Sequence, residues 1–152
     1  MEEPAGYAIR RLAEDDVDLA FKWRDMFNTA FAEPPSDPPS ADYMRRLLAD
    51  PKFIALAAVA GSEVVGGIAA YELVKYERER SEIFIYDLAV AEAHRRRGIA
   101  RCLIEAVKPI ASAVGAWMIF VQADRGDAPA IALYRSLGTE EQPLHFDISP
   151  ED

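Results

Sequence analysis

Three consecutive arginines, Arg95, Arg96 and Arg97, stand directly before Gly98 and an apolar helical stretch. Cations at a helix N-terminus oppose the helix dipole, so the triplet is unfavourable unless an anion binds there. Gly98 lets the backbone approach such an anion closely, and the amides of the first helical turn are unpaired donors for it. The sequence therefore predicts a phosphate or pyrophosphate site at residues 95–100.

The bland alternative for an arginine triplet is a solvated basic turn. Here the triplet lies between an apolar strand end at residues 88–90 and a helix that opens with Gly98, which is the strand, loop and helix arrangement of nucleotide-like ligands. The loop has no Gly-Lys-Ser/Thr ending and no Gly-x-Gly-x-x-Gly pattern. ATPase and dinucleotide-binding folds are therefore excluded.

The elements that must position this loop follow from hydrophobic periodicity and turn residues. Asp15 or Asp16 is expected to cap a first helix, Ser40 a second, and the proline-rich segment 33–39 forms the loop between them. The remaining elements are strands at 53–59, 64–74, 81–90, 117–121 and 145–148, and helices at 98–114 and 128–137. The order β-α-α-β-β-β-α-β-α-β predicts a single-sheet α/β or α+β domain.

Local details of these elements carry further expectations. Gly66 and Gly67 in a strand indicate a bulge or a close approach by another segment. Pro109 should kink or shorten its helix. Alternation in the strand over 81–90 places two sets of side chains on opposite faces if no bulge intervenes: Ile83, Ile85 and Asp87 on one, and Phe84, Tyr86 and Leu88 on the other.

The bulk properties narrow the class of protein. A chain of 152 residues with 51% hydrophobic and 28% charged residues fits one globular domain, expected over 1–152. The N-terminus lacks a signal peptide and no stretch is long and apolar enough to span a bilayer, so a soluble cytoplasmic protein is expected, with no membrane partner. The net charge of −9 argues against a nucleic-acid partner, and it fits either a cationic substrate or a surface whose acidity only aids solubility. A single cysteine, Cys102, and two histidines exclude metal sites of the Cys/His type, so no metal is expected.

Two motifs in order resemble those of the GNAT acetyltransferase superfamily. Arg95-x-x-Gly98-x-Ala100, after the strand end at 87–90, is similar to its motif A, and the Leu133-Tyr134 pair followed by Gly138 is similar to its motif B. The chain from about residue 43 onward further resembles the small aminoglycoside 3-N-acetyltransferases, through the segments 53–58, 81–83, 85–90, 121–124 and 145–148.

The resemblance implies a mixed, mainly antiparallel sheet of six to seven strands with about four flanking helices. Its fourth and fifth strands, 81–90 and 116–123, would splay apart and hold acetyl-CoA between them. The main chain of Leu88 and Val90 would pair with the pantetheine arm, and residues 95–101 would surround the pyrophosphate. The expected cofactor-binding residues are Leu88, Ala89, Val90, Arg95, Arg96, Arg97, Gly98, Ile99, Ala100, Arg101, Asp127 and Tyr134.

Two residues are expected to be catalytic. An amine attacks a thioester only when unprotonated, so a carboxylate near the cleft is expected to accept its proton. Asp87 is the first candidate for this base. The resemblance implies that Tyr134 donates a proton to the departing thiolate. The alternatives are that Asp87 only satisfies local amides or an arginine and that Tyr134 only packs on its helix.

The acceptor site is expected to be acidic, because charge-assisted hydrogen bonds hold ammonium groups. Asp124 and Asp147 are candidates for this role, and either is an alternative base. The alternative for Asp127 is a helix cap, and a core role for His145 is as well supported as a functional one. The expected substrate-binding residues are Glu82, Tyr86, Asp87, Asp124, His145 and Asp147.

The leading hypothesis is acetylation of an aminoglycoside amine, expected at N3, in an antibiotic such as gentamicin, which would confer resistance. The rival enzyme hypothesis is a GNAT acting on a polyamine or on a protein or peptide amine. A non-catalytic acyl-CoA-binding module is disfavoured, because it would dispense with Asp87 and Tyr134. Exposed apolar residues in the first helix or the last strand would allow a homodimer.

Overall fold

A computed structural model describes residues 2–151, which divide into two compact units. The first unit ends at Gln122 and contains the whole sheet, and the second starts at Ala123 and contains one helix. The single domain expected from the chain length remains a prediction.

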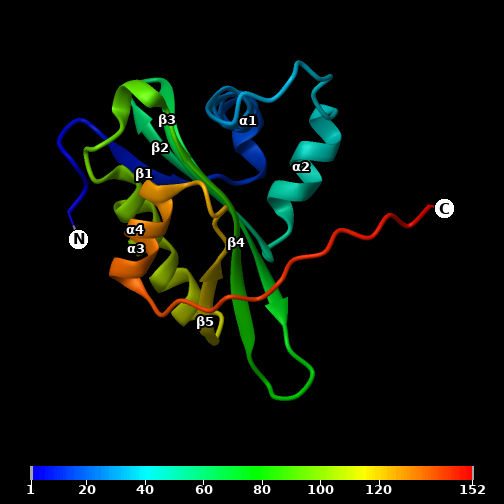
Figure 1. The fold of residues 1–152 in the computed structure, drawn as a ribbon. Coiled ribbons are helices and arrows are strands. Elements are labelled where there is room, and N and C mark those ends of the chain that lie inside the picture. The colour runs from blue at the N-terminus through cyan, green and yellow to red at the C-terminus, as the bar shows by residue number, and fades with distance from the viewer. Residues whose placement is uncertain (1, 152) are drawn as a thin grey trace. The chain divides into compact units, whose positions relative to one another are not determined.

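The sheet of the first unit has five strands in the order in which they occur along the chain (Figure 1). They are β1 (Ala8–Arg11), β2 (Phe53–Ala60), β3 (Glu63–Val74), β4 (Ser81–Val90) and β5 (Ala116–Val121). The first four pair antiparallel with their neighbours, and β4 pairs parallel with β5. The predicted mixed, mainly antiparallel sheet is confirmed, with five strands in place of six to seven.

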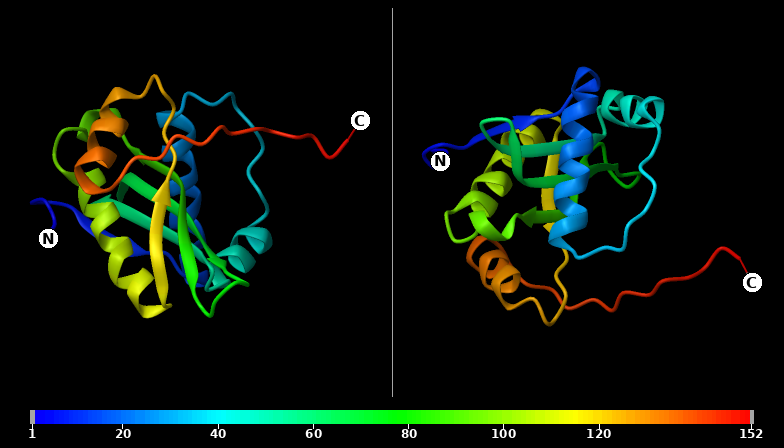
Figure 2. Two further views of the ribbon diagram at one scale, coloured as in Figure 1. Left: turned by 60° about the horizontal axis from the view of Figure 1, so that its bottom comes forward. Right: turned by 90° about the horizontal axis from the view of Figure 1, so that it is seen from above.

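Helices cover both faces of this sheet. The helices α1 (Val17–Ala30) and α2 (Ala41–Ala49) lie on one face and α3 (Ile99–Ala113) on the other (Figures 1 and 2). Short 3-10 turns, η1 (Glu14–Asp16) and η2 (Glu92–His94), precede α1 and α3. No helix among the described residues is long and apolar enough to cross a membrane.

The helix ends test the predicted caps. Ser40 caps α2 as predicted, since its hydroxyl accepts the backbone N–H of Tyr43 at 3.1 Å. Asp16 precedes α1 but does not cap it, because its carboxylate instead accepts the backbone N–H of Ala13 at 2.8 Å. Pro109 lies inside α3, which continues to Ala113, so it does not shorten the helix; the kink stays a prediction.

The core has one layer on each face of the sheet. On the first face, apolar side chains of α1 and α2 pack against alternate strand residues; this buried cluster includes Trp23, Met26, Phe27, Met44, Leu48, Phe53, Ala55, Ala57, Ala69 and Ala89. On the opposite face, α3 buries Leu103 and Val107, and the intervening strand residues Ile54, Leu56, Ile68, Ile83 and Ile85 are fully buried. The sheet is therefore shielded on both sides.

Gly67 of β3 lies at a close contact between α1 and the sheet. A Cβ at this position would stand 2.5 Å from Trp23 Nε1 and 2.9 Å from the Leu56 carbonyl oxygen. Trp23 Nε1 donates a hydrogen bond to that same carbonyl at 2.9 Å. The close approach predicted for the two glycines is confirmed, and a bulge accompanies it, since Ala58 pairs with Gly66 while Val59 pairs with Val64.

We therefore expect G67A to lower the free energy of unfolding by roughly 3 kcal/mol, because the methyl group overpacks the core and displaces a buried hydrogen bond. Urea denaturation followed by circular dichroism measures this change. The matched control is G126A, at a position where a Cβ would meet nothing within 4 Å. Equal stability of G67A and the wild type would contradict the proposed contact.

The second unit contains α4 (Ala128–Leu137), which ends before Gly138. Beyond it, the described residues 139–151 contain no strand, so the predicted strand at 145–148 is wrong. The physical reason is the lack of a partner: a strand needs a neighbour for its backbone groups, and this unit has no other strand among its described residues. The apolar side chains of the expected strand, Leu144, Phe146 and Ile148, are exposed.

Candidate active site

The strands β4 and β5 part within the first unit. Their parallel pairing runs from Ser81 opposite Ala116 to Ile85 opposite Val121 and ends there. On its other side, β4 stays paired with β3 as far as Val90. The predicted splay is confirmed, and residues 86–90 keep an edge that no strand of the first unit covers.

A β-bulge at Tyr86 lies where the two strands part. Asp87 pairs with Ala69 and Ile85 pairs with Ala70, so Tyr86 is one extra residue in β4. A bulge bends its strand and increases the local twist. The bend follows Ile85, the last residue of β4 that pairs with β5, at the point where β5 itself ends.

The same bulge changes the face on which Asp87 lies. Asp87 shares the face of Ala69, which belongs to the core layer under α1, whereas Ile85 lies on the opposite face. The Tyr86 ring packs on this α1 face too, at 6.0 Å from Tyr71. The predicted grouping of Asp87 with Ile85 is therefore wrong, because one inserted residue reverses the alternation beyond it.

The uncovered edge of β4 presents main-chain groups of Leu88 and Val90. The Ala91 N–H donates to the Val65 carbonyl of β3 at 2.8 Å. In an antiparallel pair the residues that bond to the neighbour alternate, so the main-chain groups of Leu88 and Val90 point away from β3. One of them is already used: the Val90 carbonyl accepts a bond from Arg95 Nε at 3.0 Å. The other groups on this edge are available to an extended ligand.

Residues 95–98, which we call the arginine loop, lie between this edge and α3. Arg96 and Gly98 both adopt left-handed backbone conformations, with φ of 65° and 79°. For Arg96, which is not glycine, this conformation is strained, as often happens at functional sites. No side chain caps α3 and its first turn contains no acidic residue. The amide N–H groups of that turn are therefore free of a side-chain cap, as an anion site requires.

Asp87 is half-buried, in a surrounding of tyrosines. Burial raises the pKa of its carboxyl group, and the negative charge of Glu33 raises it further. Burial likewise raises the pKa of Tyr71, with smaller contributions from Tyr86, Tyr43 and Asp87. All three tyrosines are exposed in part. The α1 face thus carries a carboxyl group with a raised pKa and, near it, partly exposed tyrosine rings.

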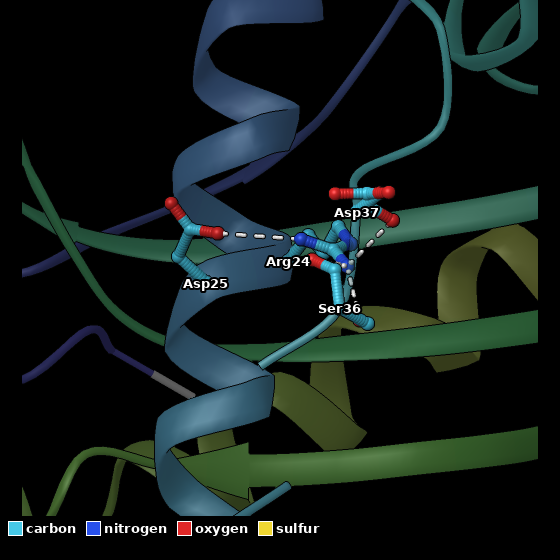
Figure 3. Close-up of polar contacts among 4 residues, drawn as sticks. All are labelled: Arg24, Asp25, Ser36 and Asp37. Atoms are coloured by element: carbon cyan, nitrogen blue, oxygen red, sulfur yellow. Dashed lines mark hydrogen bonds and ion pairs between the residues drawn. The ribbon is translucent and has the colours of Figure 1, made fainter. Parts of the chain in front are cut away.

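A salt-bridged arginine fixes the proline-rich loop that carries Glu33. Figure 3 shows Arg24 of α1 between the loop and Asp25. Its Nη2 donates to the Ser36 hydroxyl at 2.9 Å and to the Asp37 carbonyl at 3.4 Å, and its Nη1 lies 3.6 Å from the Asp25 carboxylate. The Glu33 N–H also donates to the carbonyl of Asn28, in the last turn of α1, at 2.9 Å. These contacts hold the loop at its start and at residues 36–37.

Glu82, a predicted acceptor residue, lies near the start of β4 rather than at the splay. Its carboxylate accepts a bond from Trp117 Nε1 at 3.3 Å and lies 3.8 Å from Lys75 Nζ. Within the first unit, the structure therefore does not bring Glu82 together with Asp87. Glu33, Tyr43 and Tyr71, which do interact with the Asp87 region, were not predicted, because nothing in the local sequence connects them to β4.

The other predicted residues lie in the second unit. Asp127 caps α4, accepting the Ala130 N–H at 3.2 Å, as the alternative interpretation expected. Burial, with a smaller contribution from the Asp127 charge, raises the pKa of Tyr134 to about 12. His145 Nε2 lies 2.9 Å from the Asp147 carboxylate, both side chains being exposed. The functional roles of these residues and of Asp124 stay predictions.

Metal ligation has no support within residues 2–151. No group of three or more His, Cys, Asp or Glu side chains in that range gathers closely enough to hold a metal ion.

Comparison with known proteins gives consistent results. The model of the acetyltransferase (GNAT) family matches residues 20–139. An aminoglycoside acetyltransferase from an uncultured soil metagenomic sample is 51% identical, with 94% of this chain and 97% of that chain covered and a TM-score of 0.91. Another from such a sample, solved in complex with sisomicin, is 32% identical, with 96% and 97% covered and a TM-score of 0.91.

Two curated relatives match this chain over a smaller share of their length. Streptothricin acetyltransferase of Streptomyces lavendulae is 33% identical over 48% of this chain and 39% of its own length. N-acetyltransferase 8B of Rattus norvegicus is 26% identical over 70% of this chain and 48% of its own length. The matches thus span less than half the length of these two proteins.

Proposed function

The chain belongs to the GNAT acetyltransferase family, and from this premise we propose that it transfers the acetyl group of acetyl-CoA to an amine of an aminoglycoside, with N3 as the expected position. The observation that carries the proposal is the uncovered edge of β4, which leads from Asp87 directly into the arginine loop. An edge of main-chain donors and acceptors next to an anion site fits a long ligand that ends in phosphates.

The first unit provides groups suited to the cofactor. The uncapped amides at the start of α3 and the arginines before it suit the pyrophosphate. The main chain of Leu88 and Val90 suits the amide groups of the pantetheine arm. Bound in this way, acetyl-CoA would supply the activated acetyl group.

The reaction then needs one proton acceptor and one proton donor. The acceptor amine attacks the thioester carbonyl and gives up a proton, which Asp87 accepts directly or through water. The C–S bond breaks, and the departing thiolate takes a proton from the Tyr134 hydroxyl. With its pKa raised to about 12, Tyr134 carries that proton throughout the neutral pH range. Asp124 and Asp147 remain alternative bases.

The acceptor class is supported by charge and by the relatives. Two similar structures are aminoglycoside acetyltransferases, one of them solved with sisomicin bound. The net charge of −9 favours a polycation. On the α1 face, Asp87 and Glu33 can hold ammonium groups, while Tyr43, Tyr71 and Tyr86 can pack against sugar rings. Asp124, His145 and Asp147 are further candidates for acceptor contacts.

An acceptor panel tests the proposal. Purified protein is given acetyl-CoA with sisomicin, gentamicin, spermidine or a lysine peptide, and release of the CoA thiol is followed. We expect turnover with the two aminoglycosides and little with the others. Turnover with spermidine or the peptide, together with none on either aminoglycoside, would favour the rival GNAT hypothesis.

The charge of Glu33 predicts a shift in the pH profile. Because Glu33 raises the pKa of Asp87, E33Q should lower it. A base acts when deprotonated, so activity is lost as the pH falls through this pKa, and the acidic limb of kcat/KM should move to lower pH in E33Q. The control is E63Q, at the exposed first residue of β3. An unchanged acidic limb in E33Q would contradict either the coupling or the role of Asp87.

A further inference from the structure

The hydroxyl group of Tyr7 connects the N-terminal segment to the arginine loop. Arg97 Nη1 donates a hydrogen bond to it at 2.7 Å, and His94 Nδ1 lies 2.8 Å from it. The Tyr7 and His94 rings also meet edge to face, with centroids 5.6 Å apart. These partners are 90 and 87 residues away in the sequence, so the contact exists only in the folded chain.

The chemistry of its two partners fixes the direction of the hydrogen bonds that the Tyr7 hydroxyl makes. A guanidinium group can only donate, so the Tyr7 oxygen accepts from Arg97. The Tyr7 proton is then available to His94 Nδ1, which accepts it when the neutral imidazole carries its own proton on Nε2. The result is a continuous chain from Arg97 through Tyr7 to His94, and each bond in such a chain strengthens the next.

The segment that carries Tyr7 is itself tied down. The Tyr7 N–H donates to the Pro4 carbonyl at 3.1 Å, and the Ile9 N–H donates to the Glu3 carboxylate at 2.9 Å. The thiol of Cys102, in the first turns of α3, lies 3.5 Å from the Glu2 carbonyl. Tyr7 is therefore a fixed point beside the loop rather than part of a loose end.

The arginine loop is braced at two places around its strained residue. Arg95 bonds to the Val90 carbonyl on one side of Arg96, and Arg97 bonds to Tyr7 on the other. A long arginine side chain loses rotamer freedom when it binds an anion. A hydroxyl group that already restricts Arg97 removes part of that loss before the ligand arrives.

We infer that Tyr7 is a positioning residue for the pyrophosphate of acetyl-CoA, acting through Arg97 and supported by His94. This inference rests on the proposed function, since it assumes that CoA binds at the loop. It assigns a cofactor-binding role to the N-terminal segment, which lies outside both motifs. Tyr7 holds the arginine and takes no part in acetyl transfer itself.

Calorimetric titration with CoA tests this role without an acceptor. In Y7F the ring contact with His94 remains and only the hydroxyl is lost, so the dissociation constant for CoA should rise about tenfold, the loss expected for one hydrogen bond to a charged group. In steady-state assays the KM for acetyl-CoA should rise while kcat at saturating acetyl-CoA stays within about twofold. The control is Y76F, whose ring is 99% exposed in the hairpin after β3.

Two further comparisons show whether Tyr7 acts through its partners. In a double-mutant cycle of Y7F with R97Q, the second change should cost little once the first is made. H94N keeps an acceptor near the Nδ1 position and should retain more CoA affinity than H94A. Wild-type CoA affinity in Y7F, or additive effects in the cycle, would overturn the inference. Failure of the wild-type protein to bind CoA would instead overturn the proposed function on which it rests.

Discussion

Replacing Asp87 by asparagine should lower kcat/KM for the aminoglycoside by roughly 10² to 10³, the range of a lost general base. The amide keeps the shape of the carboxylate but cannot take the proton of the attacking amine. Because Asp87 is proposed to act on the acceptor amine and not on the cofactor, the affinity for CoA should stay near that of the wild type. Thiol release at several pH values measures kcat/KM, and calorimetric titration with CoA measures the affinity.

The pH dependence of this variant gives a second, independent result. Burial raises the pKa of Asp87, so the acidic limb that this base would cause should lie at higher pH than for an exposed aspartate, and D87N should lose that limb. A folded-state pKa raised by burial means that the ionised group costs stability, so D87N should not unfold more easily at neutral pH. The control is D18N, exposed in the first turn of α1. Full activity in D87N would contradict the role of Asp87 and leave Asp124 and Asp147 as the candidate bases.

Replacing Tyr134 by phenylalanine should lower kcat about 100-fold while the KM for acetyl-CoA changes little, because the lost proton donor acts on the leaving thiolate in the transition state. With a pKa of about 12, Tyr134 should produce no basic limb of its own near neutral pH in the wild-type enzyme.

The control for Tyr134 is S136A, which removes a hydroxyl group from the same helix. That hydroxyl bonds within α4, to the Leu133 carbonyl at 2.6 Å, so its loss should leave kcat near the wild-type value. Wild-type kcat in Y134F would show that this tyrosine only packs on its helix.

Much of the fold follows from the sequence because its signals are local. The cap at Ser40 acts on a backbone N–H three residues further on, and α3 begins directly after the arginines and Gly98; the structure has both features as predicted. The close approach at Gly67 was predicted too, but not its partner Trp23, which is distant in the sequence. The splay of β4 and β5 followed from the family resemblance rather than from periodicity, and the strand pairing confirms it.

The bulge at Tyr86 and the missing last strand show where local signals end. The sequence of β4 alone does not reveal whether it contains a bulge, because a bulge is defined by the pairing of β4 with β3. In the same way, the alternating Leu144, Phe146 and Ile148 indicate a strand, but a strand forms only when a neighbour accepts its backbone. Pairing is a property of the whole sheet and not of one segment.

The candidate site was predictable where a motif carried it and not elsewhere. The loop residues 95–101 come from one contiguous pattern. Tyr7 and Glu33 act on Arg97 and Asp87 from 90 and 54 residues away, and their own neighbours carry no signal for either contact. Such long-range partners are found only once the chain is folded.

The central claim is that this protein moves an acetyl group from acetyl-CoA to an aminoglycoside amine. The most direct test is to incubate the purified protein with acetyl-CoA and sisomicin and to identify the product by mass spectrometry and NMR. We expect sisomicin carrying a single acetyl group, on N3, with one CoA thiol released for each acetyl group transferred. Unmodified sisomicin after an incubation in which the folded protein binds CoA would contradict it.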